Sequence, residues 1–118
     1  MNYQYIAKNY PNAFNLARIW WGKGYCNLVS CPSPVVNYPK DPHILVEFFD
    51  LKDIHIDTDW LYEAMLDSGI YEAKIYTKNE YPDYIFCTDE YPSRSEAESK
   101  AIMRAFEILE KSLIEIEK

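Results

Sequence analysis

The sequence predicts a single small α+β domain over residues 1–118, in which roughly three antiparallel strands pack with helices. The chain is 48% hydrophobic and 26% charged, which is typical of one folded domain and not of a disordered chain. Its C-terminal segment repeats apolar residues at helical spacing, and residues 54–88 contain stretches that alternate apolar and polar residues. We divide the chain into a basic, aromatic and proline-rich part, residues 1–40, and a core, residues 41–118.

The first predicted element is a helix over "NYPNAFNLARIWWGKG". Asn9 or Asn12 suits its N-cap, Pro11 its first turn, and Gly22 or Gly24 its end. The segment that follows, "YCNLVSCPSPVVNYPKDP", contains four of the seven prolines, so it is neither a continuous helix nor a central strand. We interpret it as an irregular arm with a short extended piece.

The middle of the chain predicts a second helix and a strand. "DPHILVEFFDLKD" has Asp41 as a cap, Pro42 in the first turn and an apolar stripe, so it favours a helix. "IHIDT" alternates apolar and polar residues, as a half-buried strand does. "DWLYEAMLDSG" is open between a continued strand and a short helix capped by Thr58 and stopped at Gly69, and its apolar spacing favours the helix slightly.

Residues 70–88 predict a hairpin, because "IYEAKIYT" and "YIFCT" flank the turn signal "KNEYPD". A long C-terminal helix follows, with Ser93 and Glu96 forming a capping box. The residues that share the apolar face of this helix are Ala97, Ala101, Ala105, Ile108, Leu109 and Leu113.

The net charge of −7 is unevenly distributed along the chain. Residues 1–40 contain four basic residues and no acid, whereas residues 41–72 contain nine acidic residues and Lys52 as the only base. An acidic middle segment repels nucleic acid and attracts basic surfaces.

The cysteines Cys26, Cys31 and Cys87 are odd in number, and the N-terminus lacks an apolar signal segment. No apolar run is long enough to span a bilayer. We therefore expect a cytoplasmic protein without membrane association. The three cysteines also admit a zinc site, but the chain lacks a CxxC pair, and buried structural thiols are the favoured interpretation.

The end of the chain, "YPSRSEAESKAIMRAFEILE", has an aromatic-flanked turn, a serine cap, Glu-Ala-Glu and an amphipathic helix closing in Glu-Ile-Leu-Glu. With "LVEFFDLKDIHID" before it, this pattern resembles an uncharacterised family of short bacteriophage and prophage accessory proteins, over roughly residues 44–117. The resemblance implies a small accessory phage protein in the cytosol of a bacterial host. Such proteins commonly bind a host protein, and anti-CRISPR inhibitors are one class of them.

His55, Asp57 and Asp59 stand two apart and project from one face of an extended chain. An imidazole with two carboxylates can ligate a divalent ion, so a metal-dependent enzyme is an alternative hypothesis. A solvated strand face is the simpler interpretation. The sequence has no phosphate-binding loop, nucleophile elbow or HExxH motif, and we predict no catalytic residues, no cofactor and no enzymatic activity.

"RIWWGKGY" is the best candidate for stacking on nucleic acid, yet its few basic residues and the acidic middle segment disfavour direct binding. We instead predict an acidic surface that binds a basic partner, with aromatic anchors. The candidate contact residues are Glu47, Asp50, Asp53, Asp57, Asp59, Glu63, Trp20 and Trp21.

The resulting hypothesis is that the protein binds and inhibits a host nucleic-acid-targeting nuclease, most plausibly a CRISPR effector or its guide-RNA complex. The alternatives are the metal-dependent enzyme and a non-enzymatic phage scaffold or adaptor protein. These alternatives belong to different classes: an inhibitor saturates at a fixed ratio, whereas an enzyme turns over and is sensitive to chelators.

Overall fold

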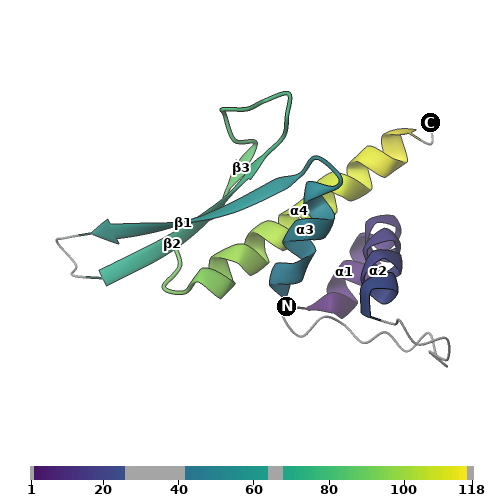
Figure 1. Cartoon of the computed structure of the whole chain (residues 1–118), viewed down its shortest axis with the longest axis horizontal. Helices are drawn as coiled ribbons and strands as arrows, with labels where there is room; N and C mark the ends of the chain where they lie inside the picture. The colour runs from purple at the N-terminus through teal and green to yellow at the C-terminus, as the bar shows by residue number, and fades with distance from the viewer. Residues whose placement is uncertain (1, 26–41, 64–67, 117–118) are drawn as a thin grey trace.

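The computed structural model describes residues 2–25, 42–63 and 68–116, and it shows the predicted α+β fold, with helices packed on a three-stranded antiparallel sheet (Figure 1). In chain order the elements are α1 (Tyr3–Asn9), α2 (Pro11–Tyr25), the 3-10 turn η1 (Pro42–Ile44), α3 (Leu45–Asp50), β1 (His55–Glu63), β2 (Ser68–Tyr76), β3 (Phe86–Cys87) and α4 (Arg94–Ile116).

The sheet has the strand order β1-β2-β3, and its main unit is the long hairpin of β1 and β2. His55 pairs with Tyr76 at one end of this hairpin, and the pairing runs without interruption to its far end. β3 is short and adds Phe86 and Cys87 to the other side of β2. Because side chains alternate along a strand, one face of the hairpin is apolar and the other is mainly polar.

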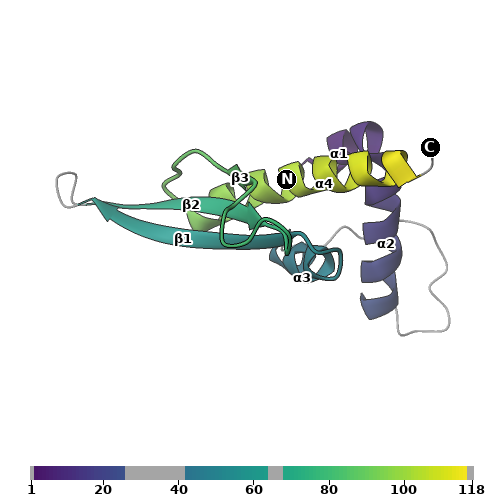
Figure 2. The same cartoon turned by 90° about the horizontal axis from the view of Figure 1, so that it is seen from above.

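The apolar face of the sheet packs on α4 (Figure 2). The predicted stripe of this helix is buried or partly buried, and the prediction omitted Ile102 and Phe106, which are fully buried. Ala73 and Ile75 of β2 are fully buried under this helix. Phe106 of α4 extends the core toward the other helices. Its ring centroid lies 4.9 Å from that of Phe49 in α3 and 6.3 Å from that of Phe14 in α2. One cluster of buried residues therefore links every helix to the sheet.

The helix α2 packs against the C-terminal half of α4 through a buried carboxylate, and α1 packs on α2 (Figure 1). Glu110 is 5% exposed, and its oxygens accept hydrogen bonds from the backbone N–H groups of Asn12 and Ala13 at 3.2 and 2.7 Å. It also accepts one from the Asn12 side-chain amide at 2.9 Å. These N–H groups lie in the first turn of α2 and have no partner within the helix, so Glu110 serves as its cap from another element.

The N-terminal prediction was partly wrong. α2 begins near the predicted position but runs through Gly22 and Gly24 to Tyr25, so neither glycine ends it. α1, which is capped by the Asn2 side chain at the Tyr5 N–H, was not predicted. Asp41, the predicted cap of the second helix, lies outside the described residues, although the helix itself is confirmed as η1 and α3.

The strand predictions also need correction. Residues 58–63 continue β1, so the slight preference for a helix beginning at Thr58 was wrong over this range; residues 64–67 lie outside the described part of the chain. The predicted hairpin over residues 70–88 exists only as the short pairing of β2 with β3, and the principal partner of β2 is β1. The C-terminal helix is confirmed, and the Ser93 hydroxyl accepts the Glu96 N–H at 3.2 Å.

The far end of the β1–β2 hairpin extends beyond the first turn of α4 in both views (Figures 1 and 2). Trp60 lies in the far half of β1 and is 55% exposed. Its indole covers Gly69 on the neighbouring strand so closely that a Cβ atom at Gly69 would lie 2.0 Å from the indole Nε1. Glycine at this position therefore gives the large aromatic ring a place to lie flat on the strand.

Candidate functional site

The sheet face turned away from α4 carries the candidate site, and we call it the outer face. The strand register places on it the side chains of His55, Asp57, Asp59, Glu72, Lys74 and Cys87. The prediction that the three β1 residues project from one face is thus confirmed. No helix among the described residues packs across this face.

Among the described residues that the register places on the outer face, Lys74 alone brings an ammonium group to the carboxylates. Lys74 Nζ is 3.4 Å from Glu72 Oε1 and 3.9 Å from Asp59 Oδ2. Burial acts to lower the pKa of Lys74, but its hydrogen bond to Glu72 and the adjacent negative charges outweigh burial and raise it. Asp57 lies opposite Lys74 in the register but has no ion pair within the described part of the chain, and it is exposed. The outer face therefore keeps an excess of negative charge.

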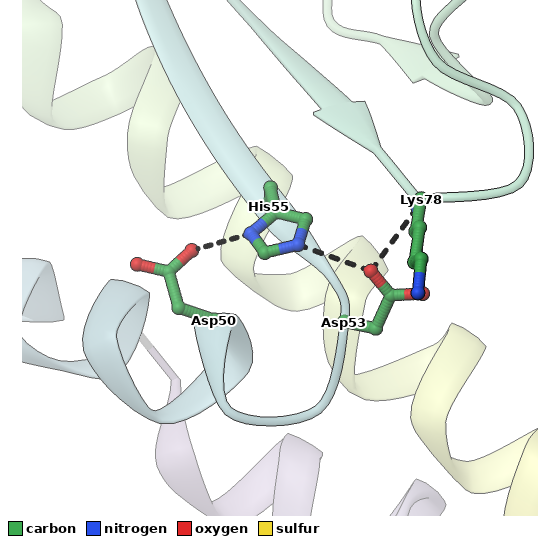
Figure 3. Close-up of polar contacts among 4 residues, drawn as sticks. All are labelled: Asp50, Asp53, His55 and Lys78. Atoms are coloured by element: carbon green, nitrogen blue, oxygen red, sulfur yellow. Dashed lines mark hydrogen bonds and ion pairs between the residues drawn. The ribbon is translucent and has the colours of Figure 1, made fainter.

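At the α3 end of the hairpin, His55 lies between two carboxylates from the preceding turn (Figure 3). Its Nδ1 is 2.9 Å from Asp50 Oδ1, and its Nε2 is 3.1 Å from Asp53 Oδ1. Asp53 also accepts the backbone N–H of Lys78 at 3.1 Å, which ties the turn before β1 to the residues after β2. Asp53 adopts a φ of 59°, a left-handed conformation that aspartate tolerates better than most residues.

The two contacts of His55 identify the protonated form of the ring. An ionised carboxylate only accepts hydrogen bonds, and a neutral imidazole has only one N–H group to donate. Both contacts are therefore satisfied only by the imidazolium. In agreement, the hydrogen bond to Asp50, together with that to Asp53, raises the pKa of His55 above its ordinary value, while burial opposes the shift.

We expect this arrangement to make stability depend on pH. Because the pKa of His55 is higher in the folded chain, the contribution of His55 to the free energy of unfolding is fully present below the pKa of the unfolded chain, about 6.5. This contribution disappears as the pH rises through the pKa of the folded chain. All three side chains are about half exposed, so the contribution is below about 1 kcal/mol. The measurement is urea unfolding of the protein and of a His55→Gln variant at pH 5.5, 6.5, 7.5 and 8.5.

The difference in the free energy of unfolding between the two proteins should shrink as the pH rises. Other titrating groups are present in both proteins, so their effects cancel. A difference that stays constant over this range would contradict the assignment of the imidazolium.

The alternative metal site is not assembled by these contacts. Both ring nitrogens of His55 face Asp50 and Asp53, and neither approaches Asp57 or Asp59 as an adjacent ligand. Within residues 2–25, 42–63 and 68–116, no group of three histidine, cysteine, aspartate or glutamate side chains is arranged to hold a metal ion.

The zinc alternative rests on Cys26 and Cys31, which lie outside the described residues. Cys87 is on the outer face, with its Sγ 3.6 Å from Glu72 Oε2. Burial, followed by the charge of Glu72, raises the pKa of the Cys87 thiol. A raised pKa lowers the thiolate fraction, so this cysteine is a poor nucleophile at neutral pH.

The remaining predicted contact residues are dispersed. Glu47 is exposed on α3, and Glu63 ends β1 at the far end of the hairpin, with its side chain outside the described detail. Trp21 is 4% exposed in the core, and Trp20 is half-buried with its ring 5.7 Å from Phe48. Adjacent residues of a helix point in different directions, but here both side chains are covered: Trp21 lies in the core, and Trp20 contacts Phe48 of α3. The two tryptophans thus offer a partner little surface.

Sequence reasoning missed two exposed aromatic residues, of which Tyr81 lies beside the acidic face and Trp60 lies on the opposite face of β1. Trp60 was treated as part of an ambiguous segment, and Tyr81, which is 70% exposed, as part of a turn. A shallow pocket of about 520 Å³ lies beside Tyr81 and is lined by His55, Asp57, Tyr76, Thr77, Lys78 and Tyr81. Strand alternation places Trp60 on the face opposite Asp57 and Asp59, so no local signal in the sequence predicts its exposure.

Among the helices of residues 2–25, 42–63 and 68–116, none combines the length and the apolar character that crossing a bilayer requires. Comparisons of the chain with protein-family models, with curated proteins and with solved structures found no match.

Proposed function

We propose that the protein is a phage-encoded inhibitor that acts in the bacterial cytosol by stoichiometric binding to a host nucleic-acid-targeting nuclease, most plausibly a CRISPR effector. The observation that carries this proposal is the excess of carboxylates on the outer face. Asp57 and Asp59 project from one face of β1, and the described part of this face has one ammonium group, that of Lys74, which pairs with Asp59 and Glu72. Nucleases that process nucleic acid have basic channels, which an acidic face complements.

Two exposed aromatic residues, Tyr81 beside the acidic face and Trp60 on the opposite face of β1, support a protein partner in particular. Trp60 and Tyr81 are 55% and 70% exposed, and exposed aromatic side chains are the usual anchors of protein interfaces. Direct nucleic-acid binding by this face is disfavoured, because phosphates and carboxylates repel one another. The nuclease is named by class from the sequence resemblance, and the acidic face supports the choice of a basic partner.

The test is a cleavage assay in which purified CRISPR effectors of several types, loaded with guide RNA, are titrated with the protein. Inhibition should reach its plateau at a fixed molar ratio, as stoichiometric binding requires. A variant that carries Asp57→Lys and Asp59→Lys should inhibit at least about tenfold more weakly, since like charges now face the basic surface. Asp53 is left unchanged because its carboxylate holds the turn before β1.

A matched control carries Glu96→Lys and Glu115→Lys, which make the same change in net charge at exposed positions of α4, the helix that packs on the opposite face of the sheet. This control should inhibit like the parent protein. Equal inhibition by the outer-face variant and the parent would overturn the acidic-face model. If every effector in the panel cleaves its target at full rate with the protein in excess, inhibition of this class of nuclease is wrong.

A further inference from the structure

The outer edge of β1 is an unpaired edge of the sheet. Within the described part of the chain the strand order is β1-β2-β3, so β1 pairs with β2 on one side and with no strand on the other. The strand is nine residues long, and its far half lies in the extension beyond α4 (Figure 1). A long unpaired edge presents backbone N–H and C=O groups to any extended segment that approaches it.

The register identifies which backbone groups face this edge. Ala73 and Tyr71 of β2 exchange hydrogen bonds with the chain on the β3 side, where Ala73 accepts the Thr88 N–H at 2.9 Å and Tyr71 accepts the Tyr91 N–H at 2.8 Å. In an antiparallel sheet the intervening residues of β2 must therefore turn their backbone groups toward β1. Their partners include Asp57 and Asp59.

It follows that Ile56 and Thr58, which alternate with these partners, direct their N–H and C=O groups away from β2 and toward the open edge. An added antiparallel strand would make its hydrogen bonds to Ile56 and Thr58. Asp57 and Asp59 would then face the added strand at non-hydrogen-bonded positions, where opposing Cα atoms are only about 4.5 Å apart and side chains meet most closely.

We propose that the open edge of β1 binds an extended basic segment of the partner as an added antiparallel strand, with lysine or arginine side chains two residues apart opposite Asp57 and Asp59. This inference rests on the proposed function and specifies how the partner is bound. Main-chain hydrogen bonds supply the affinity, and the two carboxylates supply the selectivity. The exposed Trp60 lies on the opposite face of β1 from these carboxylates, where it can contact side chains of the added strand that alternate with the basic ones.

The same carboxylates act against pairing between two copies of this protein. If two β1 edges paired with each other, the aspartates of one copy would lie near those of the other, and like charges at facing positions destabilise a sheet. The edge therefore selects basic strands over copies of itself.

The test uses a synthetic nine-residue peptide in which threonine alternates with lysine, with blocked ends, and the full-length protein. When the lysines lie opposite Asp57 and Asp59, the threonine N–H groups point at Ile56 and Thr58. Methylation of the backbone nitrogens of the threonines should weaken binding at least tenfold, measured by fluorescence anisotropy. Methylation of the backbone nitrogens of the lysines, in a peptide of equal charge, should leave the affinity within about twofold, because those backbone N–H groups point away from β1.

Two further measurements bear on the same proposal. Amide hydrogen exchange followed by NMR should slow at Ile56 and Thr58 when the peptide binds, and not at Asp57 or Asp59, whose amides are already bonded to β2. A Thr58→Pro variant removes an N–H group that faces the open edge while the hairpin ladder remains, and it should lose peptide binding with its circular dichroism spectrum unchanged.

Equal loss of affinity for the two methylated peptides, or protection of all four amides alike, would overturn strand addition. Concentration-dependent dimerisation with slowed exchange at Ile56 and Thr58 in the absence of peptide would also overturn it, in favour of a second copy. In either case the cleavage assay still decides the proposed function separately, since an acidic face can inhibit without adding a strand. Absence of any binding by the unmethylated peptide at low salt contradicts strand addition outright.

Discussion

Replacing Phe49 by alanine is expected to lower the free energy of unfolding by about 3–5 kcal/mol. Phe49 is fully buried, and its ring centroid lies 5.1 Å from that of Phe48 and 4.9 Å from that of Phe106. Its carbonyl also accepts the N–H groups of Lys52 and Ile54, so the residue stands where α3 turns into β1. Truncation removes the aromatic contacts and leaves a cavity between α3 and α4 that this turn restrains from collapsing.

The measurement is urea unfolding followed by circular dichroism. Leu51 provides the matched control, because it is two residues away and 71% exposed; Leu51→Ala should change stability by less than about 0.5 kcal/mol. A loss below 1 kcal/mol for Phe49→Ala would show that the aromatic cluster does not hold α3 on α4.

The second large effect is expected at Glu110, the buried cap of α2. Glu110→Ala should cost about 1–3 kcal/mol, because it leaves the N–H groups of Asn12 and Ala13 without an acceptor in a part of the molecule that water reaches poorly. Glu110→Gln keeps one acceptor oxygen and should retain part of the stability. In NMR spectra, the amide resonances of Asn12 and Ala13 should shift strongly in the alanine variant.

Glu115→Ala is the control for this experiment, because Glu115 lies on the same helix but is exposed. It should leave stability within about 0.5 kcal/mol. If Glu110→Ala behaves like Glu115→Ala, water replaces the carboxylate at the start of α2, and the capping argument fails.

The parts of the fold that the sequence predicted well have a local, periodic signal. The apolar stripe of α4 and its Ser93 cap are both local features, and both appear in the structure. The length of β1 was underestimated because Trp60 and Leu61 interrupt the simple alternation of the strand. Trp60 lies on the apolar face but beyond α4, so its exposure depends on where a distant helix begins, which a local pattern does not encode.

The candidate site was predictable to the same limited extent. Alternation placed His55, Asp57 and Asp59 on one face. It did not reveal that Asp50 and Asp53 would hold the His55 ring, because that depends on the turn conformation between α3 and β1. These two acids had been grouped with the partner surface, whereas the structure gives them a partner within the chain. The pairing of Lys74 with Asp59 similarly depends on a strand partner that the sequence had placed elsewhere.

The cap that Glu110 provides for α2 also constrains how the chain folds during its synthesis. Glu110 and Asn12 are 98 residues apart, so the acceptor for the first turn of α2 is translated long after the helix that it caps. A contact between residues so distant closes a long loop, and its entropic cost is met only when α4 joins the core. The helices α1 and α2 therefore emerge from the ribosome long before they can dock, and docking waits until α4 has been translated.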